Sequence, residues 1–538
     1  MSTAASSEFS SPSRIEQLLA TTAHRSPGAT ALFVQQTQLS YADLMQRVEV
    51  LAARLAALGI RRGDRVALML PNTPTYVISF YALMRLSAIA VNVSPANQGR
   101  ELSHVLRESG ALVVISLDVF LPALYKVLPG TAVQHVMVTS LQGLEQKLPR
   151  PPEVPEPQRF EDLLRPGADF APVSAQSAAD DIALLQYTSG STGVPKGVML
   201  SHRSLLASVT GICTWMQHDE TPNAGVLCII PFFHIFGLVI GLHVSVAKGY
   251  RMLLVPRFDP LDLMPLFSLI EAQRPMSIPA VPTLWAALLS HPKANAALFD
   301  SVLVASSGGA ALPGWVQARY HALTGRRIYE AYGLSEAAGA THCTPYPQGG
   351  PEGSIGKPLP GLAARVVALA EGGGPDRDVP VGEVGELVLQ GDAVMTGYFQ
   401  QPERSALALR EGWLHTGDLV YCDRDGFFYV VDRADDLIIT SAHNVYPSEV
   451  EAVLSSHPAV AEVAVVGKPD RLRGSVVCAY VVRRGDASVS VDDLLALCRA
   501  NLVDYKVPRQ ITFVDSIPHN PAGKILRRAL RSEPSPAQ

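Results

Sequence analysis

The chain has 538 residues, 48% hydrophobic and 17% charged, and its 44 Lys and Arg against 49 Asp and Glu give a formal net charge of -5. This apolar fraction can bury large cores, which excludes disorder for most of the chain. The mildly acidic balance argues against a general nucleic-acid-binding protein, which needs a basic face. A soluble enzyme of about three or four compact units is expected from the length.

Cysteine usage and the N-terminus both favour the cytoplasm. The six cysteines contain no C-x-x-C pair and do not cluster with His, so neither a zinc site nor a disulfide framework is indicated. Residues 1–14 are rich in Ser and Ala but lack an apolar run, which predicts a disordered tail and not a signal peptide.

The next segments alternate between helical and strand-like patterns. Apolar residues recur at three- and four-residue spacing over residues 15–23 and 41–58, which predicts amphipathic helices, the second with Ser40 as N-cap and Gly59 as C-cap. Short apolar runs at 65–70, 88–93 and 111–115 read as strands buried on both faces. Such strands separated by helices indicate parallel sheets covered on both sides, so the fold class is α/β.

Residues 226–247 carry no formal charge and are long enough to span a bilayer. They contain Pro231, two His and several Gly, however, which favours a buried strand, turn and helix over a membrane span. Pro- and Gly-rich stretches at 149–157 and 371–382 read as surface loops or subdomain joins.

The last hundred or so residues read as a compact α+β domain of their own. Helix patterns begin at 449–454 and 491–502, and strand patterns cover 460–467, 476–482 and 510–514.

The most informative segment is YTSGSTGVPKG at 187–197, which follows the apolar run 182–185. Its hydroxyls alternate with glycines, whose missing Cβ lets backbone N–H groups approach an anion, and Lys196 adds a positive charge; this suits phosphate. Composition alone favours a Ser/Gly-rich surface loop. A Walker loop is excluded, because Pro195 precedes Lys196 where Gly is needed and Gly197 follows it where Ser or Thr is needed.

The segment 187–197 is similar to the signature loop of the adenylate-forming superfamily, which includes acyl-CoA synthetases, aryl-CoA ligases, peptide-synthetase adenylation domains and firefly luciferase. Further motifs of that superfamily follow in order over nearly the whole chain. They are PFFHIFG at 231–237, SGGAAL at 307–312, YGLSE at 332–336, GELVLQG at 385–391, GY at 397–398, GWLHTGDL at 412–419, DR at 432–433, YPSEVE at 446–451, DYKVP at 504–508 and PAGKILR at 521–527.

The chain is therefore identified as a member of this superfamily, of the acyl-CoA synthetase or aryl-CoA ligase type. The resemblance implies an N-terminal body over 15–432, built of parallel sheets flanked by helices with a β-rich subdomain, and a small mobile α+β domain over 433–538. It also implies the reaction: a carboxylate attacks the α-phosphorus of ATP to give an acyl adenylate and pyrophosphate, and a thiol, that of coenzyme A, then displaces AMP. Because an anion must approach a polyanion, catalysis should rest on cations and N–H donors around phosphate.

The resemblance assigns roles at the nucleotide. Ser335 contacts the α-phosphate, Glu336 coordinates Mg²⁺, and Tyr332 offers its ring to adenine beside Gly309. Asp418 binds the ribose hydroxyls, with Arg433 as a second ribose or phosphate partner. The β- and γ-phosphates are held by Thr188, Ser189, Gly190, Ser191, Thr192, Gly193 and Lys196.

Lys524 matches the catalytic lysine of adenylation, which bridges the carboxylate and phosphate oxygens, and Asp435 matches the hinge about which the small domain rotates. Taken alone, these residues have ordinary interpretations: Glu336 is a helix-start carboxylate, Tyr332 a core residue and Lys524 a solvated cation in a basic tail.

The motif around His234 begins the acid pocket, and His234 itself is expected to gate the site near the acyl carboxylate or else to be a hydrogen-bonded core residue. Amino-acid-activating relatives carry an Asp after this position, whereas Ile235 stands here, so a substrate ammonium would be buried without a partner. Aryl, fatty and bulky polycyclic acids stay open. The expected pocket residues are Phe233, His234, Phe236, Gly237, Gly308, Gly309, Gly333 and Gly339.

One departure concerns the second half-reaction. Relatives usually have Gly-Gly where this chain has Ser441 and Ala442, and the added side chains would lie where the small domain lines the pantetheine channel. The hypothesis is intact adenylation with weak or delegated transfer to coenzyme A. Three alternatives remain open: an acyl-AMP ligase that serves a carrier protein or partner enzyme, a non-catalytic acyl- or nucleotide-binding protein, and a luciferase-like oxygenase. A homodimer is left open.

Overall fold

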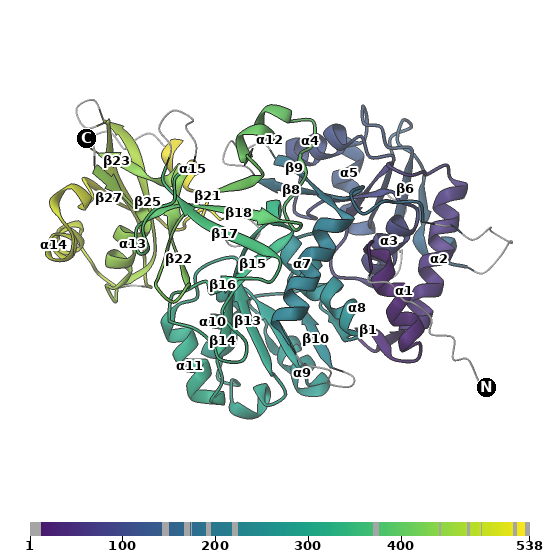
Figure 1. Ribbon diagram of the computed structural model, residues 1–538, viewed down its shortest axis with the longest axis horizontal. Helices are drawn as coiled ribbons and strands as arrows, with labels where there is room; N and C mark the ends of the chain where they lie inside the picture. The colour runs from purple at the N-terminus through teal and green to yellow at the C-terminus, as the bar shows by residue number, and fades with distance from the viewer. Residues whose placement is uncertain are drawn as a thin grey trace. The chain divides into compact units, whose positions relative to one another are not determined.

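The computed structural model describes residues 12–141, 150–165, 173, 175–189, 195–217, 224–369, 376–440, 443–470, 474–485, 487–519 and 525–532. The chain forms two compact units (Figure 1). One comprises Met1–Ala363 and Gln390–Leu414, and the other Ala364–Leu389 and His415–Gln538. Of the expected N-terminal tail, residues 1–11 lie outside the described residues, and the expected boundary at 432/433 stays a prediction.

The first unit contains a nine-stranded sheet with a parallel centre and antiparallel edges. Its strands, in spatial order, are β16 (Lys357–Pro358), β15 (Gly339–Cys343), β14 (Ile328–Leu334), β13 (Val304–Gly308), β12 (Ser277–Ala280), β10 (Gly225–Cys228), β11 (Arg251–Leu254), β1 (Thr30–Val34) and β2 (Thr37–Ser40).

An eight-stranded sheet accompanies it, in which only the pairings of β9 with β8 and with β19 are antiparallel. Its spatial order is β19 (Gly397–Tyr398), β9 (Pro195–Ser201), β8 (Ile182–Ser189), β4 (Ile89–Asn92), β3 (Arg65–Met69), β5 (Val113–Leu117), β6 (His135–Thr139) and β7 (Pro157–Arg159). The strands predicted at 65–70, 88–93 and 111–115 are confirmed as β3, β4 and β5.

Helices connect these strands (Figure 1). They are α1 (Glu16–Arg25), α2 (Tyr41–Ala57), α3 (Pro74–Arg85), α4 (Gly99–Ser109), α5 (Leu121–Val127), α6 (Phe160–Leu163), α7 (His202–Trp215), α8 (Val244–Lys248), α9 (Met264–Gln273), α10 (Pro282–Ser290), α11 (Gly314–Thr324) and α12 (Pro402–Ala408). Short helical turns lie at η1 (Asp118–Phe120), η3 (Ala296–Phe299) and η4 (Ser335–Ala337), and the two-residue strand β20 at Leu409–Arg410.

The predicted cap of α2 is confirmed at its start. The Ser40 hydroxyl accepts from the Asp43 N–H, and the Asp43 carboxylate accepts from the Ser40 N–H, which forms a capping box. At the other end Leu58 is the C-cap, and Gly59 follows it with φ +94°. The prediction of Gly59 as the C-cap was therefore one residue late, because the left-handed glycine sits just past the cap.

The apolar segment 226–247 is a buried strand, a turn and a helical segment, as predicted. It comprises β10, a turn beginning at Pro231, the π-helix η2 (Gly237–His243) and α8. No helix among the described residues is long and apolar enough to cross a membrane.

The second unit contains two sheets. One joins β17 (Leu362–Val367), β18 (Gly385–Gly391), β21 (Trp413–Cys422) and β22 (Phe428–Arg433). The other joins β24 (His443–Val445), β23 (Ile438–Thr440), β26 (Gly474–Arg483), β25 (Val460–Asp470) and β27 (Gln510–Phe513). Its helices are α13 (Pro447–Ser455), α14 (Val491–Asn501) and α15 (Arg527–Ser532), with turns η5 (Ala434–Asp436) and η6 (Asp504–Lys506). The predicted C-terminal α+β pattern and the α/β fold class are both confirmed.

Candidate functional site

A lysine, a phenol and a carboxylate meet at the edge of the eight-stranded sheet. The pairing of β8 with β9 sets Lys196 opposite Thr188, and β19 lies along β9 so that Tyr398 pairs with Val198. The Lys196 Nζ donates to the Tyr398 hydroxyl at 2.9 Å. That hydroxyl donates in turn to the Glu336 Oε1 at 2.9 Å. The Lys196 Nζ lies 3.6 Å from the Glu336 Oε1. The Tyr398 hydroxyl therefore bridges the lysine ammonium and the glutamate carboxylate.

The turn between β14 and β15 presents Ser335 and Glu336. Both residues lie in the single helical turn η4, and the Glu336 carbonyl accepts from the Met395 N–H at 2.8 Å. A Cβ at Gly333 would lie 2.0 Å from the Gly339 carbonyl oxygen. Only glycine therefore allows the two strands to approach this closely just before the Ser-Glu pair.

The chain around Pro231 is held by buried amides from other strands and loops. The Asn72 side chain donates to the Cys228 and Ile230 carbonyls at 2.8 and 2.9 Å and accepts from the Phe232 N–H at 2.7 Å. The Gln186 side chain donates to the Phe233 carbonyl at 2.9 Å and accepts from Asn92 at 2.9 Å. Because Asn72, Asn92 and Gln186 are all at most 4% exposed, these bonds fix the turn in a dry environment.

A narrow apolar gap lies behind this turn. It is lined by Leu227, Cys228, Ile230, Phe236, Gly237, Gly241 and Pro279. A Cβ at Gly308 would lie 3.7 Å from the Phe236 ring, and one at Gly339 would lie 3.8 Å from the Ile235 Cγ1. The structure therefore brings Gly308 and Gly339 against the same turn and helix as Phe236, and their role in an acid pocket stays a prediction.

His234 is oriented by its own turn. Its Nδ1 accepts from the Phe236 N–H at 3.3 Å, so a proton on the neutral ring resides on Nε2. Burial lowers the pKa of His234, which favours that neutral ring. The side chain can thus offer a hydrogen bond without adding a charge to the apolar surroundings.

The ends of β13 and β14 form the surface beside Tyr332. Gly308 pairs with Ala331, and Gly309 follows with φ +89°. The Tyr332 ring lies edge-on to His342 with ring centroids 5.9 Å apart. Ser307, 2% exposed, has a hydroxyl without a hydrogen-bond partner among the described residues, and it precedes the two glycines.

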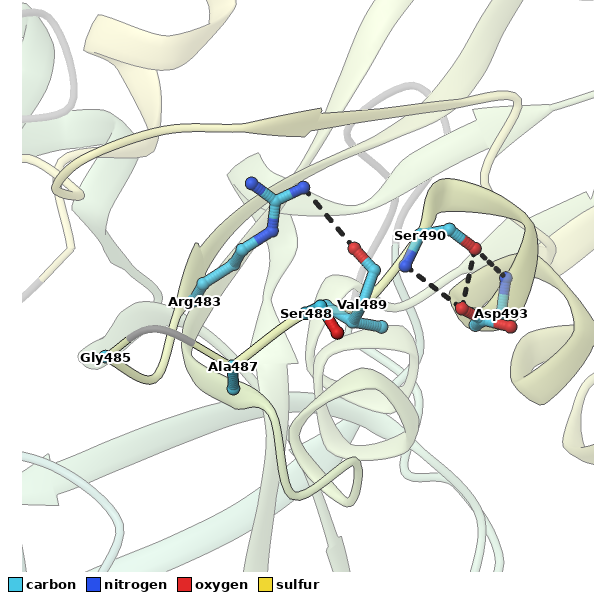
Figure 2. A pocket seen from close by; sticks show the side chains of 7 residues that line it. All are labelled: Arg483, Gly485, Ala487, Ser488, Val489, Ser490 and Asp493. Carbon is cyan, nitrogen blue, oxygen red and sulfur yellow. Dashed lines mark hydrogen bonds between the residues drawn. The ribbon is translucent and has the colours of Figure 1, made fainter.

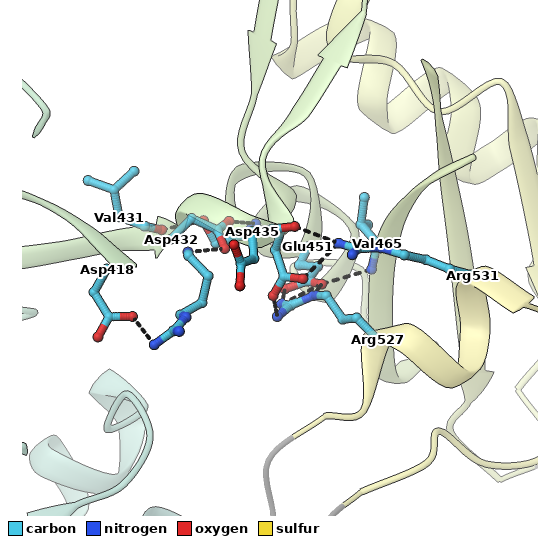
Figure 3. Close-up of polar contacts among 11 residues, drawn as sticks. Asp418, Val431, Asp432, Asp435, Glu451, Val465, Arg527 and Arg531 are labelled. Carbon is cyan, nitrogen blue, oxygen red and sulfur yellow. Dashed lines mark hydrogen bonds and ion pairs between the residues drawn. The ribbon is translucent and has the colours of Figure 1, made fainter. Parts of the chain in front are cut away.

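An ion pair joins two strands of the second unit. Asp418 on β21 pairs in register with Arg433 on β22, and the Arg433 Nη1 donates to the Asp418 Oδ1 at 2.7 Å (Figure 3). The Asp418 side chain is 8% exposed and that of Arg433 34%, so the carboxylate is held while part of the guanidinium faces solvent.

Two family models match the chain: an AMP-binding enzyme model over residues 19–399, and an AMP-binding enzyme C-terminal domain model over residues 449–524. The chain belongs to the AMP-binding enzyme family. This confirms the recognition made from the motifs.

Relatives of this AMP-binding enzyme are CoA ligases. It is 36% identical to a long-chain-fatty-acid–CoA ligase of Bacillus subtilis, with 96% of this chain and 94% of the relative covered. It is 34% identical to a feruloyl-CoA synthase of an Amycolatopsis species, with 95% and 96% covered.

Solved structures give the same result. The o-succinylbenzoate-CoA synthetase of Bacillus subtilis in complex with its acyl-adenylate intermediate has a TM-score of 0.80 at 29% identity, with 96% of this chain and 98% of that chain covered. An anthranilate CoA ligase in complex with anthranoyl-AMP has a TM-score of 0.83 at 27% identity, with 96% of each chain covered. The chain is an adenylate-forming acid–thiol ligase, and the acyl-AMP-ligase and non-catalytic alternatives are not favoured.

Several predicted site positions of this AMP-binding enzyme lie outside the described residues. They are Gly190, Ser191, Thr192, Gly193 and Lys524, together with Ser441 and Ala442 of the departing motif. Ser189 is described as the last residue of β8. Roles for these positions stay predictions.

Mg²⁺ fits the donor set that the structure describes. Among the described residues no three His, Cys, Asp or Glu side chains come together as a metal site. Glu336 supplies one carboxylate. One or two carboxylates are enough for Mg²⁺ when substrate phosphates and water supply the other ligands of the ion.

Sequence reasoning missed Tyr398, Asn72, Asn92, Gln186 and Glu330. The GY motif at 397–398 is visible in the sequence, but nothing in it indicates that the Tyr398 hydroxyl bridges Lys196 and Glu336. Glu330 pairs with Ser307 across β13 and β14. Burial raises the pKa of Glu330 to about 7, which marks it as an unusual carboxyl beside the predicted adenine surface.

The residues that line a hollow in the second unit include none of the predicted site residues (Figure 2). The Ser490 and Asp493 side chains on its wall form a capping box for α14, and the Arg483 guanidinium donates to the Val489 carbonyl at 3.3 Å. The same guanidinium lies 3.5 Å from the centroid of the Phe513 ring. These polar groups already have partners within the domain, so the hollow shows no site chemistry.

Proposed function

We propose that this chain joins an apolar carboxylic acid to coenzyme A at the expense of ATP. In the first step a carboxylate oxygen attacks the α-phosphorus, the bond to the β-phosphate oxygen breaks, and pyrophosphate leaves. In the second step the coenzyme A thiolate attacks the acyl carbonyl and AMP leaves with the electron pair. The observation that carries the proposal is the Lys196–Tyr398–Glu336 cluster, within a chain that matches CoA ligases over almost its whole length.

The cluster suits the handling of triphosphate. Lys196 supplies a positive charge at the end of the predicted phosphate loop, with Thr188 opposite it across the strands. Glu336 would hold Mg²⁺, which supplies charge neutralisation between phosphate oxygens. The adjacent Ser335 hydroxyl would contact the α-phosphate, where charge develops during attack.

The residues that the superfamily motifs assign to the nucleoside would recognise its base and its ribose. Tyr332 and Gly309 would contact adenine. Asp418 would accept from the two ribose hydroxyls while the Arg433 guanidinium, which donates to its Oδ1, orients the carboxylate. Lys524 would bridge carboxylate and phosphate after the residues beyond Asp435 rotate.

The acid site favours an uncharged, apolar substrate body. The gap beside Phe236 and Gly237 has only apolar side chains, a thiol and glycines along it. Ile235 is 3% exposed and offers no partner for an ammonium group. Fatty and aryl acids match the apolar character of these residues, and both classes appear in the names of the relatives.

Coenzyme A is the proposed acceptor, with no carrier protein required. Relatives that match 96% and 95% of the chain are a long-chain-fatty-acid–CoA ligase and a feruloyl-CoA synthase. Ser441 and Ala442 nevertheless replace two glycines expected in the pantetheine channel, so we expect thioester formation to be the slower half-reaction. The double variant S441G/A442G should speed conversion of acyl adenylate to acyl-CoA and leave adenylation unchanged; an unchanged rate of thioester formation would contradict this role.

The central experiment combines two assays over a panel of acids. ATP–pyrophosphate exchange reports acyl-adenylate formation, and consumption of coenzyme A reports thioester formation. We expect both ATP–pyrophosphate exchange and consumption of coenzyme A with fatty or aryl acids. In Lys524→Ala we expect exchange to be lost while the protein stays folded. Exchange without thioester formation would select an acyl-AMP ligase, and tight ligand binding without either activity would select a binding protein.

A further inference from the structure

A second charged network, distinct from the nucleotide residues, surrounds Arg527 at the start of α15 (Figure 3). The Arg527 Nη2 donates to both carboxylate oxygens of Glu451, at 2.9 and 2.8 Å. Its Nη1 lies 3.3 Å from the Asp436 Oδ2. The side chains of Arg527, Glu451 and Asp436 are 14%, 15% and 18% exposed, so this geometry is largely shielded from water.

Arg531 strengthens the same connection from one helical turn further on. Its Nη2 donates to the Asp436 Oδ1 at 2.7 Å and to the Asp435 carbonyl at 3.3 Å. Asp436 therefore receives hydrogen bonds from two guanidinium groups on one face of α15. Because Asp435 and Asp436 both belong to η5, α15 is attached directly to the turn that carries the proposed hinge.

Glu451 connects the network to the C-terminal sheet. The residue lies on α13, and its Oε1 also accepts from the Val465 N–H on β25 at 2.8 Å. Burial raises the pKa of Glu451, whereas Arg527 opposes that change by favouring the charged form. Through Arg527 and Glu451 the network thus joins the proposed hinge turn, α13 and β25, an edge strand of the C-terminal sheet.

Docking of α15 does not depend on these charges alone. Leu530 on the same helix is 2% exposed, and its carbonyl accepts from the Tyr480 hydroxyl at 3.1 Å. Ile525 and Leu526, directly before α15, are also held, since Ile525 forms a β-bridge with His519 and the Leu526 N–H donates to the Pro518 carbonyl at 2.8 Å. Apolar packing therefore anchors α15, and the ion pairs fix the orientation of the helix relative to the proposed hinge turn.

We propose that Arg527 is a positioning residue for adenylation: it locks the start of α15, three residues beyond Lys524, to the hinge turn at Asp436. Rotation at Asp435 then moves the attachment point of Lys524 together with the hinge. This inference rests on the proposed function, in which Lys524 acts in the first half-reaction only. The inference predicts that weakening the ion pairs of Arg527 slows adenylation more than thioester formation.

The test uses the full chain with R527Q and R527K. ATP–pyrophosphate exchange measures adenylation, and thioester formation from supplied acyl adenylate measures the second half-reaction. We expect R527Q to lower exchange about 10- to 100-fold, as small misplacements of catalytic groups do. The melting temperature of R527Q should fall, because Glu451 and Asp436 lose a shielded partner, whereas thioester formation should change little. R527K, which keeps the charge but loses the planar fork, should recover part of the exchange.

The matched control is R509Q, because Arg509 pairs with exposed Asp504 in the same unit. It should leave both half-reactions unchanged. D436N is the second variant, since it removes only the hinge end of the network; it should reproduce the selective loss even if R527Q does not fold. Equal loss of both half-reactions, or normal exchange in D436N, would overturn the inference. Absence of exchange in the unaltered chain with every acid would instead refute the proposed function.

Discussion

The Glu330 carboxyl makes the stability of this protein depend on pH in an unusual range. Burial raises its pKa from the ordinary 4.5 to about 7; the nearby Glu352 charge adds to the increase, and the Leu312 N–H opposes it. Folding therefore favours the protonated carboxyl. Its stabilising contribution is fully present below pH 4.5 and is lost as the pH rises through 7.

The size of the effect follows from the two pKa values. At 1.36 kcal/mol per pKa unit, the difference between 4.5 and about 7 corresponds to about 3 kcal/mol of unfolding free energy. Glu330→Gln keeps a side chain of the same shape that can accept from the Leu312 N–H but cannot ionise. The variant should therefore gain stability relative to the unaltered chain as the pH rises.

Urea unfolding at pH 5 and pH 8 measures this difference directly. We expect the stability advantage of Glu330→Gln to grow by about 2–3 kcal/mol between the two pH values, with partial exposure accounting for the lower figure. Glu271→Gln, at an exposed position on α9, is the control for loss of a carboxylate. A difference between Glu330→Gln and the unaltered chain that does not vary with pH would refute the reasoning.

Three further variants test other parts of the site. Tyr398→Phe removes the hydroxyl that joins the lysine to the carboxylate and should raise the KM for Mg·ATP about tenfold, with the KM for the acid unchanged in steady-state kinetics. Gly237→Ala would place a Cβ 2.3 Å from the Pro231 carbonyl oxygen, so it should lower the unfolding free energy by at least about 2 kcal/mol, measured by denaturant titration. Asp418→Asn should weaken discrimination between ATP and 2′-deoxy-ATP, measured as the ratio of their kcat/KM values; an unchanged ratio would exclude the ribose role.

Elements whose signals are local could be predicted from the sequence. The capping box at Ser40 needs only residues three apart, and the alternation from α13 to β27 appears directly in the spacing of apolar residues. The segment 226–247 was interpreted correctly because Pro231 and its glycines are incompatible with an uninterrupted membrane helix.

Features that depend on distant contacts could not be predicted. Tyr398 lies about two hundred positions from Lys196, and only the pairing of β19 with β9 brings its hydroxyl between Lys196 and Glu336. The local sequence around Asn72 and Gln186 does not indicate that their side-chain amides support the turn at Pro231. Their role comes from tertiary hydrogen bonds, for which no periodicity exists.

The contacts around the proposed hinge at Asp435 divide into those that rotation would break and those that it would preserve. Before the hinge, Asp432 accepts from the Ser448 N–H at 2.9 Å, and the Val431 carbonyl accepts from the Ser448 hydroxyl at 2.7 Å (Figure 3). These bonds connect β22 with α13 across Asp435, so a large rotation there must exchange them for water or new partners. The bonds from Arg527 to Asp436 lie wholly beyond the hinge and can persist. If the domain rotates at Asp435 as proposed, it needs both kinds of contact: hydrogen bonds across the hinge that can be exchanged, and a shielded network that keeps α15 fixed to the turn at Asp436.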